Sequence, residues 1–128
     1  MGEQIIHFAG LKFRAPSRAF LLDKFDKFKI VVTVNADFIV TAHRDSRFKE
    51  IINENYATFD GQVPYWLAKL VSYRAKAEIE KVSGSDLIID LLRRAESDGR
   101  RVFLLEASAD SNAKAVEIAR ERFGVEVD

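Results

Sequence analysis

The sequence contains no cysteine, and it has no excess of charge of either sign. The absence of cysteine excludes a disulfide framework and thiol chemistry, and it is typical of a cytoplasmic protein. Twenty basic residues balance twenty acidic ones, so the formal net charge is zero. That balance supplies no electrostatic footprint for nucleic acid, and we expect no nucleic-acid partner.

Long apolar runs and paired metal ligands are missing as well. No uncharged run approaches the roughly 20 residues that a membrane helix needs. The first residues, Met1–Gln4, lack the basic-then-apolar layout of a signal peptide. The two histidines, His7 and His43, stand apart without any ligand spacing, so we expect no metal site.

What the sequence does contain is enough apolar material for one domain, since 48% of its 128 residues are hydrophobic. Short β-branched segments alternate with segments of helical period. This alternation predicts an α/β fold with a largely parallel sheet and helices on both faces. The expected strands are Ile5–Phe8, Ile30–Val34, Tyr56–Phe59, Ile79–Val82 and Val102–Leu105.

Amphipathic segments between these strands predict helices, the first capped by Ser17 and the second restarted at Asp45-Ser46. Asp60-Gly61 resembles a hairpin turn, but the apolar spacing that follows it predicts a helix with Pro64 in its first turn. The predicted helix faces are Leu21, Leu22, Phe25 and Phe28; Phe38, Ile39 and Ala42; Phe48, Ile51 and Ile52; Val63, Trp66, Leu67, Leu70 and Val71; Ile88, Leu91, Leu92 and Ala95; and Val116, Ala119 and Phe123.

Polar residues collect where the expected strands end. In an open parallel sheet, ligands bind outside the carboxyl ends of the strands. Each polar cluster also opens a helix, whose free N–H groups favour an anion or a phosphate. These clusters are Thr33-Val34-Asn35, Asp60-Gly61-Gln62, Ser83-Gly84-Ser85-Asp86 and Glu106-Ala107-Ser108.

Each cluster also has a purely structural interpretation, because Ser, Asn and Asp are preferred helix caps. Thr33 is β-branched and suits a strand for that reason alone. Trp66 has helical spacing and is expected in the core. The sequence has no phosphate-binding loop and no Gly-x-Gly-x-x-Gly pattern.

Three segments taken together are more specific than any of these clusters: VVTVNADFIVTAHRDSRF (31–48), FDGQVPYWLAKL (59–70) and EKVSGSDLIIDLLRRAESDGRRVFLL (80–105). They closely resemble the WecG/TagA/CpsF family, glycosyltransferases of family 26, over roughly residues 5 to 123. The resemblance implies a Rossmann-like fold and inverting transfer of an N-acetylmannosamine-like sugar from a UDP-sugar. The implied acceptor is an undecaprenyl-diphosphate-linked sugar at the inner membrane face, in cell-wall or surface polysaccharide synthesis.

The motifs of the family fall on particular residues of this chain. Its Thr-x-Asn motif falls on Thr33 and Asn35, and its Asp-Gly on Asp60 and Gly61. The resemblance implies that Asp60 is the general base. The Thr33 hydroxyl is expected to donate a hydrogen bond to the diphosphate of the donor or of the acceptor. The resemblance does not require a metal, and we expect no cofactor. The expected substrate-binding residues are Asn35, Gly61, Gln62, Gly84, Ser85 and Asp86.

The chain departs from the family pattern in two places. Glu106-Ala107 stands where members usually carry Gly-Gly, and a carboxylate there repels a diphosphate. The chain also stops at Asp128, so we expect residues 1–128 to form one domain that matches roughly the first two-thirds of the family domain. A sheet edge bared in this way invites another chain, which predicts a homo-oligomer or a partner that completes the sheet.

These departures leave three hypotheses open. The first is a sugar transferase with Asp60 as its base. The second is a truncated, noncatalytic relative that acts as a binding or assembly module. The third is a generic nucleotide-binding domain, since a fold alone does not reveal a function.

Overall fold

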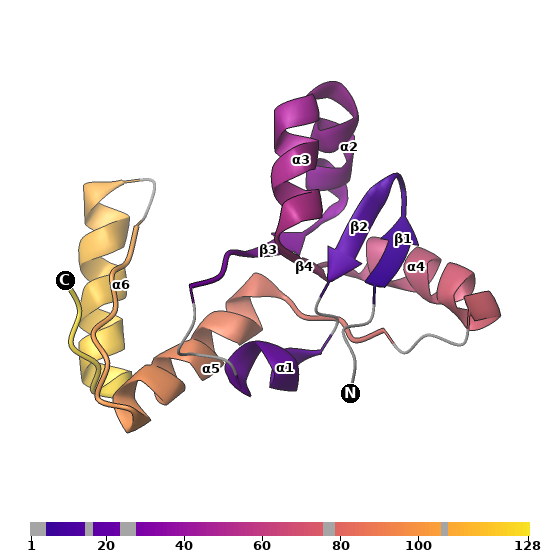
Figure 1. The fold of residues 1–128 in the computed structure, drawn as a ribbon. Coiled ribbons are helices and arrows are strands. Elements are labelled where there is room, and N and C mark those ends of the chain that lie inside the picture. Colours follow the sequence, from indigo (N-terminus) through magenta and orange to yellow (C-terminus); the bar gives the residue numbers. More distant parts are fainter. Residues whose placement is uncertain (1–4, 15–16, 24–27, 76–78, 106–107) are drawn as a thin grey trace. The chain divides into compact units, whose positions relative to one another are not determined.

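Residues 5–14, 17–23, 28–75, 79–105 and 108–128 are described by a computed structural model of the protein (Figure 1). The chain divides into two units, Met1–Gly84 and Ser85–Asp128. The described residues form two pairs of strands and six helices. The α/β class is therefore confirmed, whereas a largely parallel sheet covered on both faces stays a prediction.

A parallel pair of strands organises the first unit. β3 (Val31–Val34) lies beside β4 (Tyr56–Phe59), with Thr33 opposite Thr58 and Val34 opposite Phe59. On its other side, Phe59 forms a single parallel bridge with Lys81. The strand predicted at 79–82 is thus reduced to that bridge, although its direction agrees with the prediction.

A hairpin that the sequence did not predict packs beside this pair. β1 (Ile5–Phe8) is a strand as predicted, but it pairs antiparallel with β2 (Leu11–Arg14). Ala9 and Gly10 join them with φ angles of 50° and 74°, the left-handed conformation of tight hairpin turns. The alternation of apolar and basic residues in Leu11–Arg14, Leu-Lys-Phe-Arg, was the available signal in the sequence.

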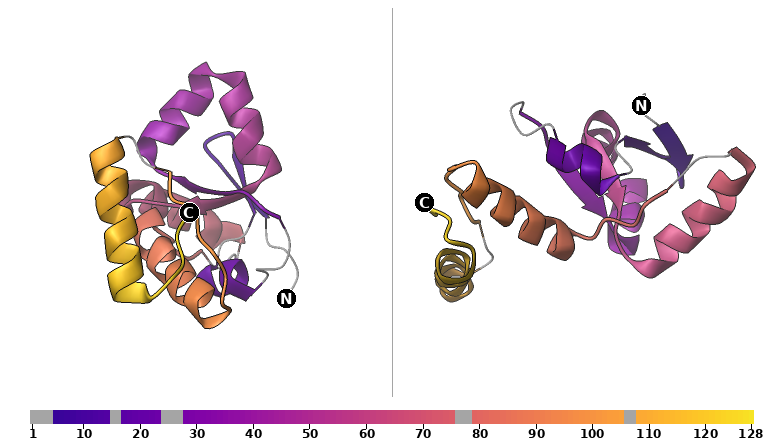
Figure 2. Two further views of the ribbon diagram at one scale, coloured as in Figure 1. Left: turned by 90° about the vertical axis from the view of Figure 1, so that its left-hand side faces the viewer. Right: turned by 90° about the horizontal axis from the view of Figure 1, so that it is seen from below.

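Helix caps in the first unit follow the sequence closely. α1 (Arg18–Asp23) begins where the Phe20 amide donates to Ser17 Oγ at 3.2 Å. α2 (Ala36–Arg44) and α3 (Ser46–Glu54) form a helical hairpin (Figure 2), and Asp45 caps α3 as predicted. α4 (Gln62–Ala75) follows Asp60-Gly61, so the helix prediction there is confirmed.

The core of the first unit centres on the ring of Phe59. Phe13 stacks on it with ring centroids 3.9 Å apart and an interplanar angle of 16°, and Phe8 meets its edge at 6.0 Å. The buried cluster joins the hairpin, the parallel pair and the α2–α3 hairpin. Its members are Ile6, Leu11, Phe13, Val34, Ala42, Ile52, Ala57, Phe59 and Ala68.

The second unit has a smaller core of its own. α5 (Gly84–Ser97) and α6 (Ala109–Phe123) contribute Leu92, Ala95 and Ala119, and the chain end contributes Val125 and Val127. α6 ends at Gly124, whose φ of 65° is the left-handed conformation that glycine adopts at helix ends. The strand predicted at 102–105 is reduced to one bridge between Val102 and Val127.

Several apolar residues predicted to be buried are exposed. Helical spacing identifies one face of a helix, but only the part of that face that meets a neighbouring element is buried. Phe25 and Glu106-Ala107 lie outside the described residues. The exposed residues that correct the prediction are Phe28, Ile51, Val63, Trp66, Leu67, Leu70, Val71, Ile88, Phe103 and Leu105.

None of the described helices is both long enough and apolar enough to cross a membrane.

The stacked rings give a direct test of the first core. Phe59→Ala should lower the free energy of unfolding of the first unit by about 3–5 kcal/mol, because a fully buried ring leaves a cavity. Urea denaturation followed by far-UV circular dichroism measures the loss. Phe28→Ala removes the same group from a side chain that is 94% exposed, so its effect should stay within about 0.5 kcal/mol. Equal losses in both variants would contradict the assigned core.

Candidate functional site

The candidate site lies at the carboxyl edge of the β3–β4 pair. The Asp60 amide donates to the Val34 carbonyl at 2.9 Å, so the parallel pairing continues one residue beyond Phe59. Asn35 and Asp60 are consequently the first residues after β3 and β4 at the carboxyl edge of the pair. Both are half-buried. This is the edge at which the sequence predicted a site.

A third segment reaches the same edge and is fixed there by β4. The Val82 amide donates to the Phe59 carbonyl at 3.0 Å, and Thr58 Oγ1 donates to the Val82 carbonyl at 3.1 Å. Thr58 is fully buried, so its bond is shielded from water. These two bonds hold the chain that leads into Gly84 against β4.

Gly84 contacts two of the predicted site residues. Its amide donates to Asp60 Oδ2 at 3.3 Å. A Cβ atom at position 84 would lie 3.1 Å from Thr33 Oγ1, which is closer than nearly all real Cβ contacts. Glycine therefore lets the backbone pass beside the Thr33 hydroxyl while it bonds the Asp60 carboxylate.

Asp60 and Asn35 play different parts in this arrangement. The hydrogen bond of the Asp60 carboxylate runs across to Gly84 and not to the helix that Asp60 itself precedes. Asn35 instead caps α2, because its Oδ1 accepts from the Phe38 amide at 3.0 Å. The structural interpretation thus holds for Asn35, whose amide group is the end that can donate to a ligand.

The structure gives the remaining predicted residues individual positions rather than mutual contacts. Gly61 has a φ of 89°, a conformation that favours glycine, and it lets α4 start immediately after Asp60. Gln62 is the exposed first residue of α4. Ser85 and Asp86 are exposed in the first turn of α5, within the second unit, and their contribution to the site stays a prediction.

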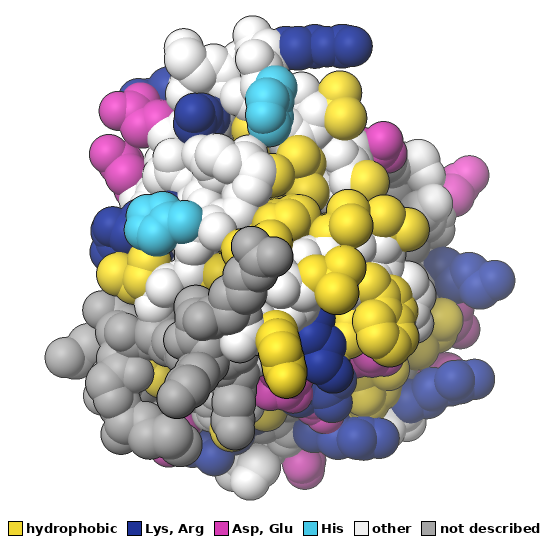
Figure 3. All heavy atoms as spheres, turned by 90° about the vertical axis from the view of Figure 1, so that its right-hand side faces the viewer, with side chains coloured by type: hydrophobic (Ala, Val, Ile, Leu, Met, Phe, Trp, Pro, Cys, Tyr) yellow, Lys and Arg dark blue, Asp and Glu magenta, His cyan; other side chains and the backbone are white. Residues whose placement is uncertain are grey.

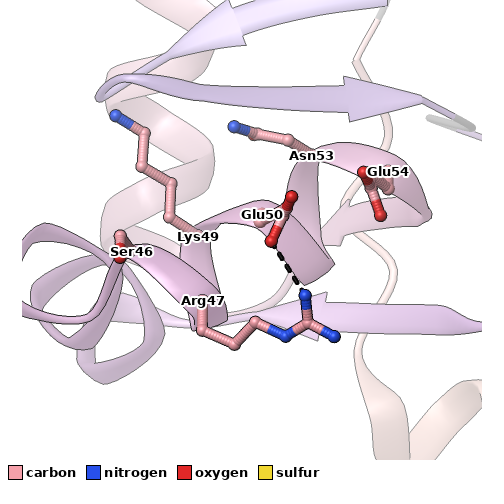
Figure 4. Close-up of a pocket in the computed structure, with 6 residues that line it drawn as sticks. All are labelled: Ser46, Arg47, Lys49, Glu50, Asn53 and Glu54. Atoms are coloured by element: carbon pink, nitrogen blue, oxygen red, sulfur yellow. Dashed lines mark hydrogen bonds and ion pairs between the residues drawn. The ribbon is translucent and has the colours of Figure 1, made fainter.

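The structure has an open hollow elsewhere, along α3, which no predicted site residue lines (Figure 4). Arg47 forms an exposed ion pair with Glu50 at 3.0 Å, and the Lys12 amide donates to Asn53 Oδ1 at 2.8 Å. The two cations and two carboxylates that line it offer no net charge for a phosphate. The lining residues are Ser46, Arg47, Lys49, Glu50, Asn53 and Glu54.

Metal-ligating side chains do not gather within the described part of the chain, where no group of three or more His, Cys, Asp or Glu could hold an ion. His43 Nδ1 lies at hydrogen-bond distance, 2.8 Å, from the Ile39 carbonyl oxygen four residues earlier in α2. His7 lies exposed on β1.

Thr58 is the supporting residue that the sequence argument missed. It occupies a position in Tyr56–Phe59 that is sealed from solvent, and a hydroxyl there needs a partner. The available signal was a lone polar residue inside an otherwise apolar strand.

A comparison with protein-family models matches residues 6–127 to the model described as Glycosyl transferase WecG/TagA/CpsF family. The matched range contains Thr33, Asp60 and Gly84. The search of curated proteins gave no match.

The close approach of Gly84 to Thr33 predicts a measurable coupling. Gly84→Ala should cost about 1 kcal/mol of unfolding free energy, because the added methyl group meets Thr33 Oγ1. In a Thr33→Ala background the same change should cost much less, since the opposing hydroxyl is gone. Urea denaturation of the wild type, both single variants and the double variant completes the cycle. Additive effects within error would show that the two residues do not touch.

Proposed function

The chain belongs to the WecG/TagA/CpsF family of glycosyltransferases, and from this premise we propose which sugar it transfers and how. The proposed donor is a UDP-sugar of the N-acetylmannosamine type, and the acceptor is an undecaprenyl-diphosphate-linked sugar used in cell-wall or surface polysaccharide synthesis. Transfer inverts the configuration of the sugar carbon. The observation that best supports a catalytic site is the half-buried Asp60 carboxylate, bonded by Gly84 at the carboxyl edge of β3 and β4.

Asp60 is the proposed general base. Inversion requires the acceptor hydroxyl to attack the sugar carbon on the side opposite the departing diphosphate. As the new carbon–oxygen bond forms and the bond to the UDP oxygen breaks, the hydroxyl proton passes to a carboxylate oxygen of Asp60. The Gly84 amide occupies Oδ2, so we assign the proton to Oδ1.

Thr33 is the proposed positioning residue for the diphosphate. Its hydroxyl lies on β3, next to the chain at Gly84, where no Cβ blocks access to it. A hydroxyl that donates to a charged phosphate oxygen forms a strong, charge-assisted hydrogen bond. The N-termini of α2 and α4 open from the same edge and favour an anion.

We propose roles for the other predicted site residues and for the free edge of the sheet as well. Asn35, Gly61 and Gln62 flank the carboxylate, and Gly84, Ser85 and Asp86 are the further proposed substrate-binding residues. We also propose that the strands belong to a Rossmann-like sheet, and that the outer edge of β3 receives a second copy or a partner. In the described residues β3 pairs on one side only.

Replacing the base is the decisive experiment. Asp60→Asn should lower kcat by about 10²- to 10⁴-fold, because the amide has a similar shape but cannot take the proton. UDP release from UDP-sugars and a lipid-diphosphate acceptor analogue measures turnover, and calorimetry with UDP measures donor binding. Binding should remain close to that of the wild type.

Asp45→Asn is the matched control, since Asp45 caps α3 away from the site and asparagine caps equally well. It should keep full activity. Turnover that persists in Asp60→Asn would contradict the assignment of the base. A wild type that binds UDP without turnover would support the noncatalytic module instead.

The Thr33 hydroxyl gives a second test. Thr33→Val keeps the shape of the side chain and should weaken UDP binding about tenfold to a hundredfold, the value of one hydrogen bond to a charged group. Thr33→Ser restores the donor and should recover most of the affinity. Equal affinity for UDP in the valine and serine variants would exclude the proposed contact.

A further inference from the structure

One side of α4 presents large apolar side chains to solvent. The α4 stripe consists of Val63, Trp66, Leu67, Leu70 and Val71, which are between 49% and 71% exposed. Their spacing places them along one side of the helix. Figure 3 views the side of the molecule on which α4 projects, and hydrophobic side chains there form a connected area bordered by charged ones. Exposed apolar areas of this kind usually mark an interaction surface.

The stripe is not the most deeply buried part of α4. Among the α4 residues whose burial is described, Pro64 and Ala68 are buried, and both have small side chains. At about 100° per residue they lie on a different side of the helix from Trp66 and Leu70. These small residues are the buried ones on that side of the helix, whereas the larger apolar residues of the stripe are 49% to 71% exposed.

We propose that the α4 stripe docks α4 on the surface of an anionic lipid bilayer. The sequence of α4 contains Lys69 and Arg74 but neither Asp nor Glu, a charge pattern complementary to anionic headgroups. Lys69 Nζ lies 5.6 Å from the ring centroid of Tyr65 and 5.8 Å from that of Trp66. Tryptophan and tyrosine beside a lysine are the residues that settle at the headgroup level.

The dimensions of α4 suit a helix that lies in the plane of the surface. With 14 residues it is about 21 Å long, shorter than the roughly 30 Å hydrocarbon core. A second copy of the chain is a less suitable occupant. Two facing α4 helices would bring their cations together without an acidic residue from either helix to offset them.

Docking through α4 would also place Asp60, two residues before the helix, close to the bilayer surface. That consequence rests on the proposed function, since a lipid-linked acceptor would present its sugar there. The docking itself rests on α4 alone and is tested without a sugar donor. If docking fails, the transferase proposal is unaffected. If the transferase proposal fails, docking through α4 is unaffected.

Trp66 makes the test specific, because it is the only tryptophan of the chain. The full chain is titrated with vesicles of phosphatidylcholine containing about one-third phosphatidylglycerol, and with vesicles of phosphatidylcholine alone. The Trp66 emission should shift to the blue on the anionic vesicles. Leu70→Glu should weaken partitioning at least about tenfold, since an apolar side chain in the stripe becomes charged.

Leu105→Glu is the matched control, the same substitution at a residue that is 88% exposed and lies outside α4. It should partition like the wild type. Lys69→Gln should weaken binding to the anionic vesicles about fivefold and leave neutral vesicles unaffected. Circular dichroism checks that each variant is folded.

Three results would overturn the proposal. The first is an emission spectrum that anionic vesicles leave unchanged. The second is a loss of partitioning in Leu105→Glu that equals the loss in Leu70→Glu. The third is a blue shift that grows with protein concentration in the absence of lipid, which would identify a second copy as the occupant.

Discussion

The pairing of β4 on both of its sides is the constraint on which the candidate site depends. One side holds β3, which brings Thr33 and Asn35 to the carboxyl edge, and the other holds Val82, which leads into Gly84. The stacked ring of Phe13 presses on Phe59 at the end of the same strand. The four residues of β4 thus connect the hydrophobic core directly to the polar edge. The packing of Phe59 therefore fixes the position of Asp60, the next residue.

The sequence predicted the local features of the fold well, because those features are encoded locally. Caps at Ser17 and Asp45 and the strand Tyr56–Phe59 each depend on a few adjacent residues. What it missed depends on partners far along the chain. The spacing of Trp66 and Leu70 identified a helix face, but spacing does not say whether another element covers that face. The β1–β2 hairpin is an exception, because it is local and was missed only since no strand was predicted at Leu11–Arg14.

The candidate site shows the same division. Family motifs pointed to Thr33 and Asp60, Gly84 was an expected substrate-binding residue, and the structure brings these three together. Nothing in the motifs pointed to Thr58, because its importance comes from a hydrogen bond to a carbonyl 24 positions away. Asn35 was singled out with Thr33, yet its oxygen is engaged in capping α2. The sequence therefore predicted which residues lie at this edge. It did not predict which of them serve the fold and which remain available to a substrate.

The long connection between Thr58 and Val82 has a consequence for how the protein loses its activity. The intervening chain contains all of α4, and closing it costs conformational entropy that the burial of Val82 and the bonds at 82–84 help to offset. Local opening of this short segment would release the Gly84 amide from Asp60 while the stacked rings stay in place. Hydrogen exchange at the Val82 amide would then be faster than in the core strand, and heating would inactivate the enzyme before the first unit unfolds.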